Sequence, residues 1–120
     1  MNKWISFSPE EVRKLTSNPK TMEDNTEMQC PICGKNSIRR YFHELKIGRT
    51  IGTTWYWCYN CKKYIHFTGG PLSEKYVFDD PLKKLEQWEF AELQGKNWYE
   101  YLNSLWVDKI LPQTFKQKNK

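Results

Sequence analysis

The fold of this chain is decided by two short stretches, Cys30-Pro31-Ile32-Cys33-Gly34 and Trp57-Cys58-Tyr59-Asn60-Cys61. They contain all four cysteines of the chain, as two C-x-x-C pairs with 24 residues between them. Two thiolates three positions apart on a tight turn can bind one metal ion from the same side, and a second such turn completes a tetrahedron. Zn²⁺ suits four sulfur ligands because its d¹⁰ shell imposes no geometry of its own. The spacing therefore predicts one structural Zn²⁺ bound by Cys30, Cys33, Cys58 and Cys61.

Length and composition favour a small protein stabilised by its metal. The chain has 120 residues, of which 38% are hydrophobic and 16% aromatic, so large rings must supply much of the core. No run approaches the roughly 20 apolar residues of a membrane span, and the first residues lack a secretion-signal pattern. We therefore expect a cytoplasmic protein without a membrane partner, in which paired cysteines bind metal rather than form disulfides.

Between and after the cysteine pairs, the pattern is typical of strands. Residues 38–47 and 51–57 flank the short connection Gly48-Arg49-Thr50, and an alternating third segment ends near Gly69. With its two cysteine turns and a predicted three-stranded antiparallel sheet, the chain resembles a zinc ribbon over roughly residues 28–68. The resemblance implies a structural metal. The second turn departs from the family pattern, because Lys62 stands where a glycine commonly follows the last cysteine.

Helices are predicted on both sides of this segment. Ser8-Pro9-Glu10-Glu11 has the form of a capping box with proline in the first turn, and predicts a short N-terminal helix. Asp80-Pro81 predicts the start of a second helix that Gly95 ends, and Asn97 predicts the cap of a third that finishes before Pro112. We therefore predict a small α+β protein, in which a zinc ribbon carries a short N-terminal helix and a C-terminal helical hairpin.

The predicted organisation has four parts. Residues 1–27 form a helical arm and linker, residues 28–70 the ribbon, residues 71–112 the hairpin packed on it, and residues 113–120 a basic flexible tail.

The net charge of +5 is concentrated in the ribbon, where residues 30–67 carry seven basic groups against one acidic group. Four thiolates on one Zn²⁺ contribute −2, so part of this charge balances the metal site. Cations interleaved with aromatic rings can also bind a partner, since cations contact phosphates or carboxylates while rings stack. The candidate binding surface consists of Arg39, Arg40, Arg49, Trp55, Tyr56, Lys62, Lys63 and Tyr64. The alternative interpretation is that these rings are core and the cations a solvated face.

Signs of catalysis are missing from the sequence. A four-cysteine zinc site has no open position for chemistry, and no paired carboxylates or phosphate-binding glycine loop is present. His43 and His66, the only histidines, lie on predicted strands and are more typical of packed or surface rings than of ligands. We predict neither an enzyme nor a small-molecule substrate.

The predicted function is non-catalytic binding of a protein partner. The aromatic segment from Trp98 to Trp106, leading to Leu111-Pro112, resembles small bacterial immunity or inhibitor proteins, which mask a toxin. That resemblance implies a basic ribbon face docked on an acidic protein. The alternative is a nucleic-acid-binding ribbon of the transcription or ribosome-associated kind.

Overall fold

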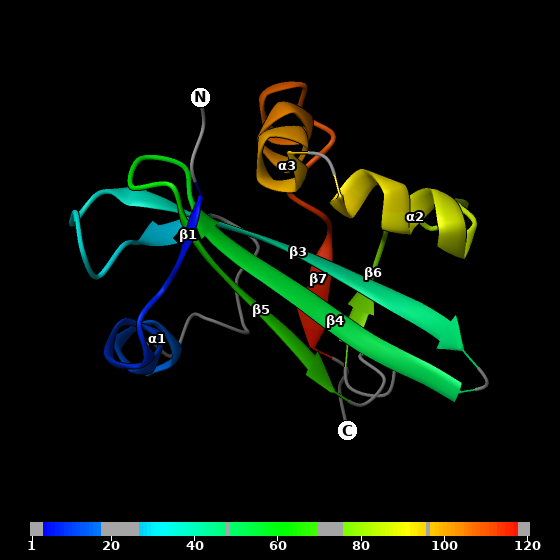
Figure 1. Cartoon of the computed structure of the whole chain (residues 1–120), viewed down its shortest axis with the longest axis horizontal. Helices are drawn as coiled ribbons and strands as arrows, with labels where there is room; N and C mark the ends of the chain where they lie inside the picture. Colours follow the sequence, from blue (N-terminus) through cyan, green and yellow to red (C-terminus); the bar gives the residue numbers. More distant parts are fainter. Residues whose placement is uncertain (1–3, 18–26, 48, 70–75, 96, 118–120) are drawn as a thin grey trace.

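The centre of the molecule is a mixed five-stranded sheet (Figure 1). The computed structural model describes residues 4–17, 27–47, 49–69, 76–95 and 97–117. The strands of the sheet are β1 (Ile5–Ser6), β2 (Met28–Gln29), β3 (Asn36–Ile47), β4 (Arg49–Cys58) and β5 (Lys63–Gly69). Their spatial order is β1-β5-β4-β3-β2, with β1 parallel to β5 and the other pairs antiparallel.

The predicted three-stranded antiparallel sheet corresponds to β3, β4 and β5. In the β3–β4 hairpin the register runs from Ile38 opposite Cys58 to Ile47 opposite Arg49, so the connection is shorter than the three residues predicted. The count of three strands was too low, because β1 and β2 extend the sheet at its two edges. These two-residue strands are too short to produce an alternating pattern that a sequence can reveal.

One face of the sheet is covered by two helices, α2 (Gln87–Gln94) and α3 (Trp98–Val107). Tyr41 and Trp55 on the strands pack in one core cluster with Phe90 of α2 and Leu102 of α3. The sheet and the two helices therefore share one aromatic core. Trp55 is 2% exposed, which confirms for this ring the alternative interpretation that the aromatic side chains of the strands belong to the core.

The opposite face carries α1 (Pro9–Thr16) near the cysteine end of the sheet (Figure 1). Leu15 of α1 is buried with Ile38 and Tyr56 of the sheet. The predicted capping box is confirmed: Glu11 N donates to Ser8 Oγ at 3.2 Å, and Ser8 N donates to Glu11 Oε1 at 2.9 Å. Such a box satisfies two backbone donors that the first turn leaves without partners.

The second helix begins later than predicted. Asp80 does not cap a helix at Pro81. Its carboxylate accepts hydrogen bonds from Tyr41 and His43 of β3, and the chain then forms turns until α2 starts at Gln87. Gly95 ends α2 as predicted. Asn97 occupies the N-cap position of α3 but has a left-handed backbone, with φ of 39°, and makes no side-chain cap bond.

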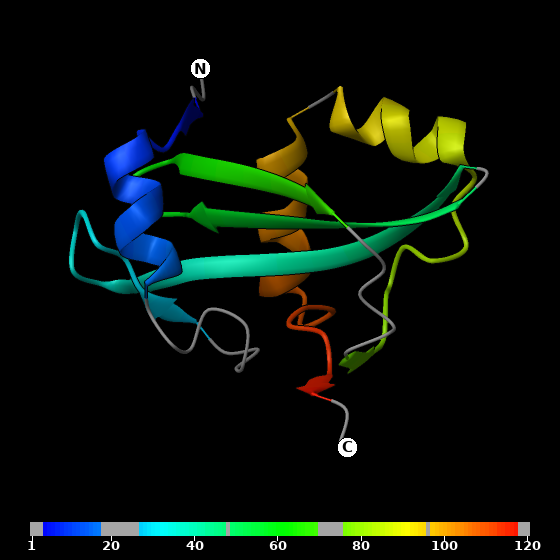
Figure 2. The same cartoon turned by 90° about the horizontal axis from the view of Figure 1, so that it is seen from below.

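The prediction of a flexible tail from residue 113 is wrong for its first residues. Phe115–Gln117 form β7, which pairs antiparallel with β6 (Tyr76–Phe78) in a second, two-stranded sheet near the C-terminus (Figure 2). Gln113 is only 2% exposed, and Asp79 accepts hydrogen bonds from the backbone and hydroxyl of Thr114. The partners of this segment lie far away in sequence, so its composition alone suggests a solvated tail. Residues 118–120, and residues 18–26 of the predicted N-terminal arm and linker, lie outside the described residues.

Candidate metal centre

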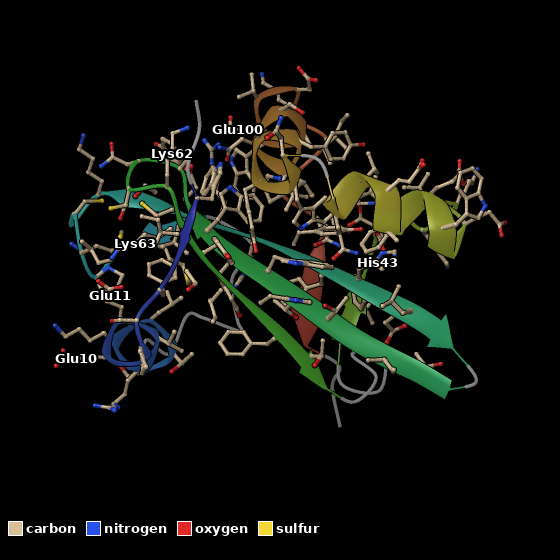
Figure 3. The ribbon with its side chains drawn as sticks, in the orientation of Figure 1. Glu10, Glu11, His43, Lys62, Lys63 and Glu100 are labelled. Carbon is tan, nitrogen blue, oxygen red and sulfur yellow. The ribbon has the colours of Figure 1, made fainter. Side chains whose placement is uncertain are left out.

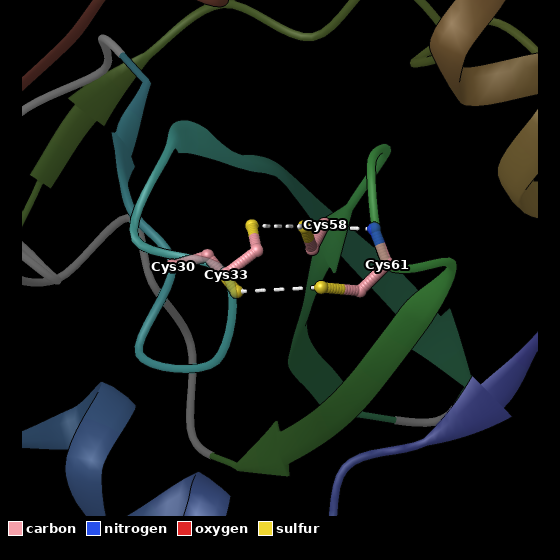
Figure 4. A group of neighbouring side chains, drawn as sticks. All are labelled: Cys30, Cys33, Cys58 and Cys61. Atoms are coloured by element: carbon pink, nitrogen blue, oxygen red, sulfur yellow. Dashed lines mark hydrogen bonds between the residues drawn. The ribbon is translucent and has the colours of Figure 1, made fainter.

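The four cysteines come from two turns at the same end of the sheet (Figure 4). Cys30 and Cys33 lie in the turn between β2 and β3, whereas Cys58 ends β4 and Cys61 lies in the turn before β5. The antiparallel register brings the turns together, because Ile38 at the start of β3 is opposite Cys58. Cys30 and Cys58 are almost fully buried, with exposures of 1% and 0%.

The sulfur positions fit a tetrahedral metal ion. All four ligand atoms lie within 4.8 Å of one another, and the pairs Cys30–Cys61 and Cys33–Cys58 are each 3.9 Å apart. A Zn–S bond of about 2.3 Å places the sulfurs of a regular tetrahedron about 3.8 Å apart. A disulfide needs about 2.05 Å, so the four thiols are free. The cluster can therefore hold one metal ion with four ligands and no open position.

The two turns have matching backbone geometry. Gly34 has φ of 77° and its N–H donates to Cys30 O at 2.9 Å; Lys62 has φ of 60° and its N–H donates to Cys58 O, also at 2.9 Å. Lys62 thus adopts the left-handed conformation that glycine takes in the first turn, despite its side chain. Each turn also directs a backbone N–H at sulfur, from Ile32 to Cys30 at 3.4 Å and from Cys61 to Cys58 at 3.2 Å.

The surroundings of the sulfurs shift the pKa values of the cysteines in different directions. Burial raises the pKa of Cys30 and that of Cys61. A hydrogen bond with the Ser37 hydroxyl is the main cause that lowers the pKa of Cys33 to about 6. Because metal ligands must be thiolates, a bound cation would supply the charge that keeps the buried sulfurs deprotonated.

The candidate binding surface does not form one exposed patch. Arg40, Trp55 and Tyr56 are 3%, 2% and 1% exposed, so the prediction is wrong for these three residues. Along β3 and β4, side chains point in turn to the two faces of the sheet, and both faces are covered at this point. The sequence alone does not show that both faces are covered. The side chain of Arg49 lies outside the described residues.

The other predicted surface cations make contacts within the chain. Lys62 Nζ lies 2.8 Å from Glu100 of α3, and Lys63 Nζ lies 3.0 Å from Glu11 of α1 (Figure 3). Arg39 bonds Glu27 at 2.8 Å, and its guanidinium lies over the rings of Tyr59 and Trp106 at 4.0 and 5.1 Å. Tyr64 stacks on Tyr99 with ring centroids 4.6 Å apart. These side chains join the helices to the sheet.

The sequence predicted neither the role of Ser37 nor the contacts of His43. Ser37, at the start of β3, places its hydroxyl between Cys33 and Cys58. Further along β3, His43 is buried, stacks on Phe90 and bonds Asp80, as Tyr41 does. The alternation of Tyr41 and His43 puts both on one face of β3, but the sequence gives no sign that Asp80 returns to them.

Comparison with family models, with curated proteins and with solved structures finds no match for this chain. Among the described residues, no helix has the length and apolarity needed to cross a membrane.

Proposed function

We propose that this chain is a non-catalytic zinc-binding module of the zinc-ribbon kind, in which one Zn²⁺ joins the turns at Cys30–Cys33 and Cys58–Cys61. The observation that carries the proposal is the convergence of all four sulfurs within 4.8 Å, from two turns of matched backbone geometry. Zinc is favoured over other metals because four thiolates in a tetrahedron are its usual structural ligand set. Reduced thiols also suit the cytoplasm, where we place the protein.

Metal analysis of the purified protein tests this proposal. We expect one zinc per chain in the wild type, loss of zinc in Cys58→Ser, and retention in Ser6→Ala, which changes an exposed serine on β1. Removal of zinc with a chelator should lower the melting temperature, because the binding free energy of a structural metal contributes directly to folding. A wild-type protein without stoichiometric zinc, whose stability is unaffected by chelator, would contradict the proposal.

We further propose that the module acts by binding a protein. Several large apolar side chains are exposed on or next to the helices: Trp88 of α2 is 63% exposed, Val107 at the end of α3 is 72% exposed, and Ile110 just after α3 is 46% exposed. Exposed aromatic and aliphatic groups of this size are common anchors of protein interfaces. The immunity-type role is a narrower form of the same proposal, in which the partner is a toxin.

Affinity capture from the native host, compared between variants, tests the protein-binding proposal. A partner captured in stoichiometric amount should be lost with Trp88→Lys or Val107→Lys. It should be retained with Val77→Lys, a matched control on β6 whose side chain is 58% exposed. Equal capture by all three variants would contradict a role for the helices.

The nucleic-acid alternative now has less support, because Arg40, Trp55 and Tyr56 are buried and Lys62 and Lys63 contact acidic residues of the chain. It remains testable by titration with RNA or DNA at several salt concentrations. Phosphate contacts would give a log–log slope of about −0.7 to −0.9 per neutralised phosphate.

A further inference from the structure

The Ser37 hydroxyl is buried against the metal-binding sulfurs. Ser37 is 0% exposed, and its Oγ lies 3.0 Å from Cys58 Sγ and 3.5 Å from Cys33 Sγ. One cysteine comes from each turn, so the hydroxyl contacts both halves of the cluster. A buried hydroxyl needs a hydrogen-bond partner, and a thiolate at this distance is a strong acceptor.

An irregularity in the sheet directs the Ser37 side chain toward the sulfurs. On β2, the consecutive residues Met28 and Gln29 are paired with Ile38 and Asn36 of β3, so Ser37 is the extra residue of a β-bulge. A bulge changes the direction in which a side chain points and leaves the extra residue outside the regular ladder. The backbone of Ser37 is still bonded, because Tyr59 N donates to Ser37 O at 3.2 Å and Ser37 N donates to Lys35 O at 2.8 Å.

The other acceptor within reach of the hydroxyl is already used. Lys35 O lies 3.3 Å from Ser37 Oγ, but it also accepts from Cys30 N at 2.7 Å and from Ser37 N at 2.8 Å. A carbonyl oxygen has two lone pairs, and these two shorter bonds occupy them. The hydroxyl proton is therefore available to sulfur, and Cys58 Sγ is the nearest acceptor.

We propose that Ser37 is a positioning residue of the metal centre, whose single hydroxyl proton is shared between the thiolates of Cys58 and Cys33 and protects these two ligands from electrophiles. The inference rests on the proposed zinc site. A hydrogen bond to a thiolate withdraws negative charge from the sulfur and lowers its nucleophilicity. Four thiolates on Zn²⁺ carry a net charge of −2, so such donors reduce the excess charge at the centre.

The donors are unequally distributed over the four sulfurs. Cys58 Sγ is contacted by Cys61 N and Ser37 Oγ, and Cys30 Sγ is contacted by the backbone N–H groups of Ile32 and Cys33. Within the described part of the chain, no backbone N–H or hydroxyl donates to Cys61 Sγ, and Cys61 is also more exposed than Cys30 and Cys58. Electrophilic attack should therefore begin at Cys61.

Alkylation of the zinc-loaded protein with iodoacetamide tests the proposal. In this reaction a thiolate displaces iodide and forms a thioether, a far poorer ligand, so metal is released and a chromogenic chelator reports the rate. We expect Ser37→Ala to release zinc roughly tenfold faster, since a hydrogen bond to a charged group changes an equilibrium by about that factor or more. Ser37→Thr keeps the hydroxyl and should stay near the wild-type rate, as should the control Ser6→Ala.

Peptide mapping during the same reaction provides a second measurement. In the wild type, modification should appear first on Cys61, and in Ser37→Ala it should shift toward Cys33 and Cys58. Full zinc content with equal release rates and an unchanged order of modification would overturn the role of Ser37 alone. A wild-type protein that contains no zinc would overturn the zinc site and this inference together.

Discussion

The side-chain amide of Gln113 pairs with the backbone of Phe42 as a neighbouring strand would. Phe42 N donates to Gln113 Oε1, and Gln113 Nε2 donates to Phe42 O, both at 2.8 Å. Gln113 Nε2 also donates to Asp79 O at 2.6 Å. β2 pairs only with the start of β3, so the rest of β3 is an edge of the described sheet. At this edge the buried side chain of Gln113 satisfies both the N–H and the C=O of Phe42.

We therefore expect Gln113→Ala to lower the free energy of unfolding by about 2–4 kcal/mol, because the N–H and C=O of Phe42 would lose this partner in a buried site. Gln113→Glu should cost a similar amount, since a carboxylate can accept from Phe42 N but cannot donate to Phe42 O. Denaturant unfolding of the zinc-loaded protein measures both effects. Gln94→Ala, at an exposed position of α2, is the control. A loss for Gln113→Ala no larger than that of the control would contradict this role.

This pairing shows where sequence reasoning fails for this chain. The capping box of α1 and the four metal ligands were predicted because each rests on residues a few positions apart, with a geometry the spacing determines. Gln113 and Asp80 form contacts with β3 across 71 and 37 positions. No local pattern reveals such contacts, so residue 113 was assigned to a flexible tail and Asp80 to a helix cap.

The prediction of the candidate binding surface is wrong for a related reason. An alternating strand indicates which residues share a face, but it does not show whether that face meets solvent or another element. In this protein α1 covers part of one face and α2 and α3 the other, so Trp55 and Tyr56, which point to opposite faces, are both buried. The rings predicted to bind a partner form core contacts instead.

The left-handed backbone of Lys62 gives a second prediction. Lys62→Gly and Lys62→Ala both remove the ammonium group that contacts Glu100, so their difference isolates the backbone. Because φ is 60° at this position, we expect the glycine variant to be more stable than the alanine variant by about 1 kcal/mol or more. Chemical denaturation with zinc bound measures the difference. Equal stability, or a more stable alanine variant, would show that the second turn does not require this conformation.

Gly34 provides the matched case in the first turn. Its φ is 77°, and a Cβ atom added there would meet no heavy atom within 4 Å, so Gly34→Ala changes the backbone preference without a clash. We expect a loss of about 1–2 kcal/mol for this variant in the same assay.

The contacts of Glu11 predict a pH-dependent stabilisation of α1. The backbone N–H of Ser8, followed by Lys63, holds the pKa of Glu11 below its ordinary value of 4.5. Since the folded pKa is lowered, the contribution is fully present above pH 4.5 and is lost as the pH falls through the folded pKa. The difference in unfolding free energy between wild type and Glu11→Gln should therefore be constant near neutral pH and shrink in acid.

Urea unfolding of both proteins at matched pH values measures this difference. Acid also protonates the metal ligands, so only the comparison between variants at one pH is informative. Glu10→Gln, which changes an exposed carboxylate in the same helical turn, is the control (Figure 3). A wild-type advantage that grows on acidification would contradict the assignment.

The last prediction concerns Asp80, whose buried carboxylate fastens the segment before α2 to β3. It accepts from Tyr41 Oη and from His43 Nδ1, each at 2.5 Å, and from Leu82 N at 2.9 Å. Burial, together with the Asp80 charge, raises the pKa of Tyr41, so this hydroxyl stays a donor. Leaving a buried donor without its acceptor costs about 1–3 kcal/mol, and Asp80→Ala removes the acceptor of two such donors, so we expect a loss of about 2–6 kcal/mol. Asp108→Asn, at an exposed position after α3, should change stability by less than about 0.5 kcal/mol.

Zinc content distinguishes this local effect from general unfolding. His43 lies five residues along β3 from Ile38, which is opposite Cys58, and at about 3.3 Å per residue this separates the two sites by roughly 17 Å. Asp80→Ala should therefore still bind one zinc per chain while the hydrogen on His43 Nδ1 becomes exposed to exchange in NMR spectra. A variant that loses zinc together with its helices would show instead that the metal end of the sheet folds only when the Asp80 end is in place.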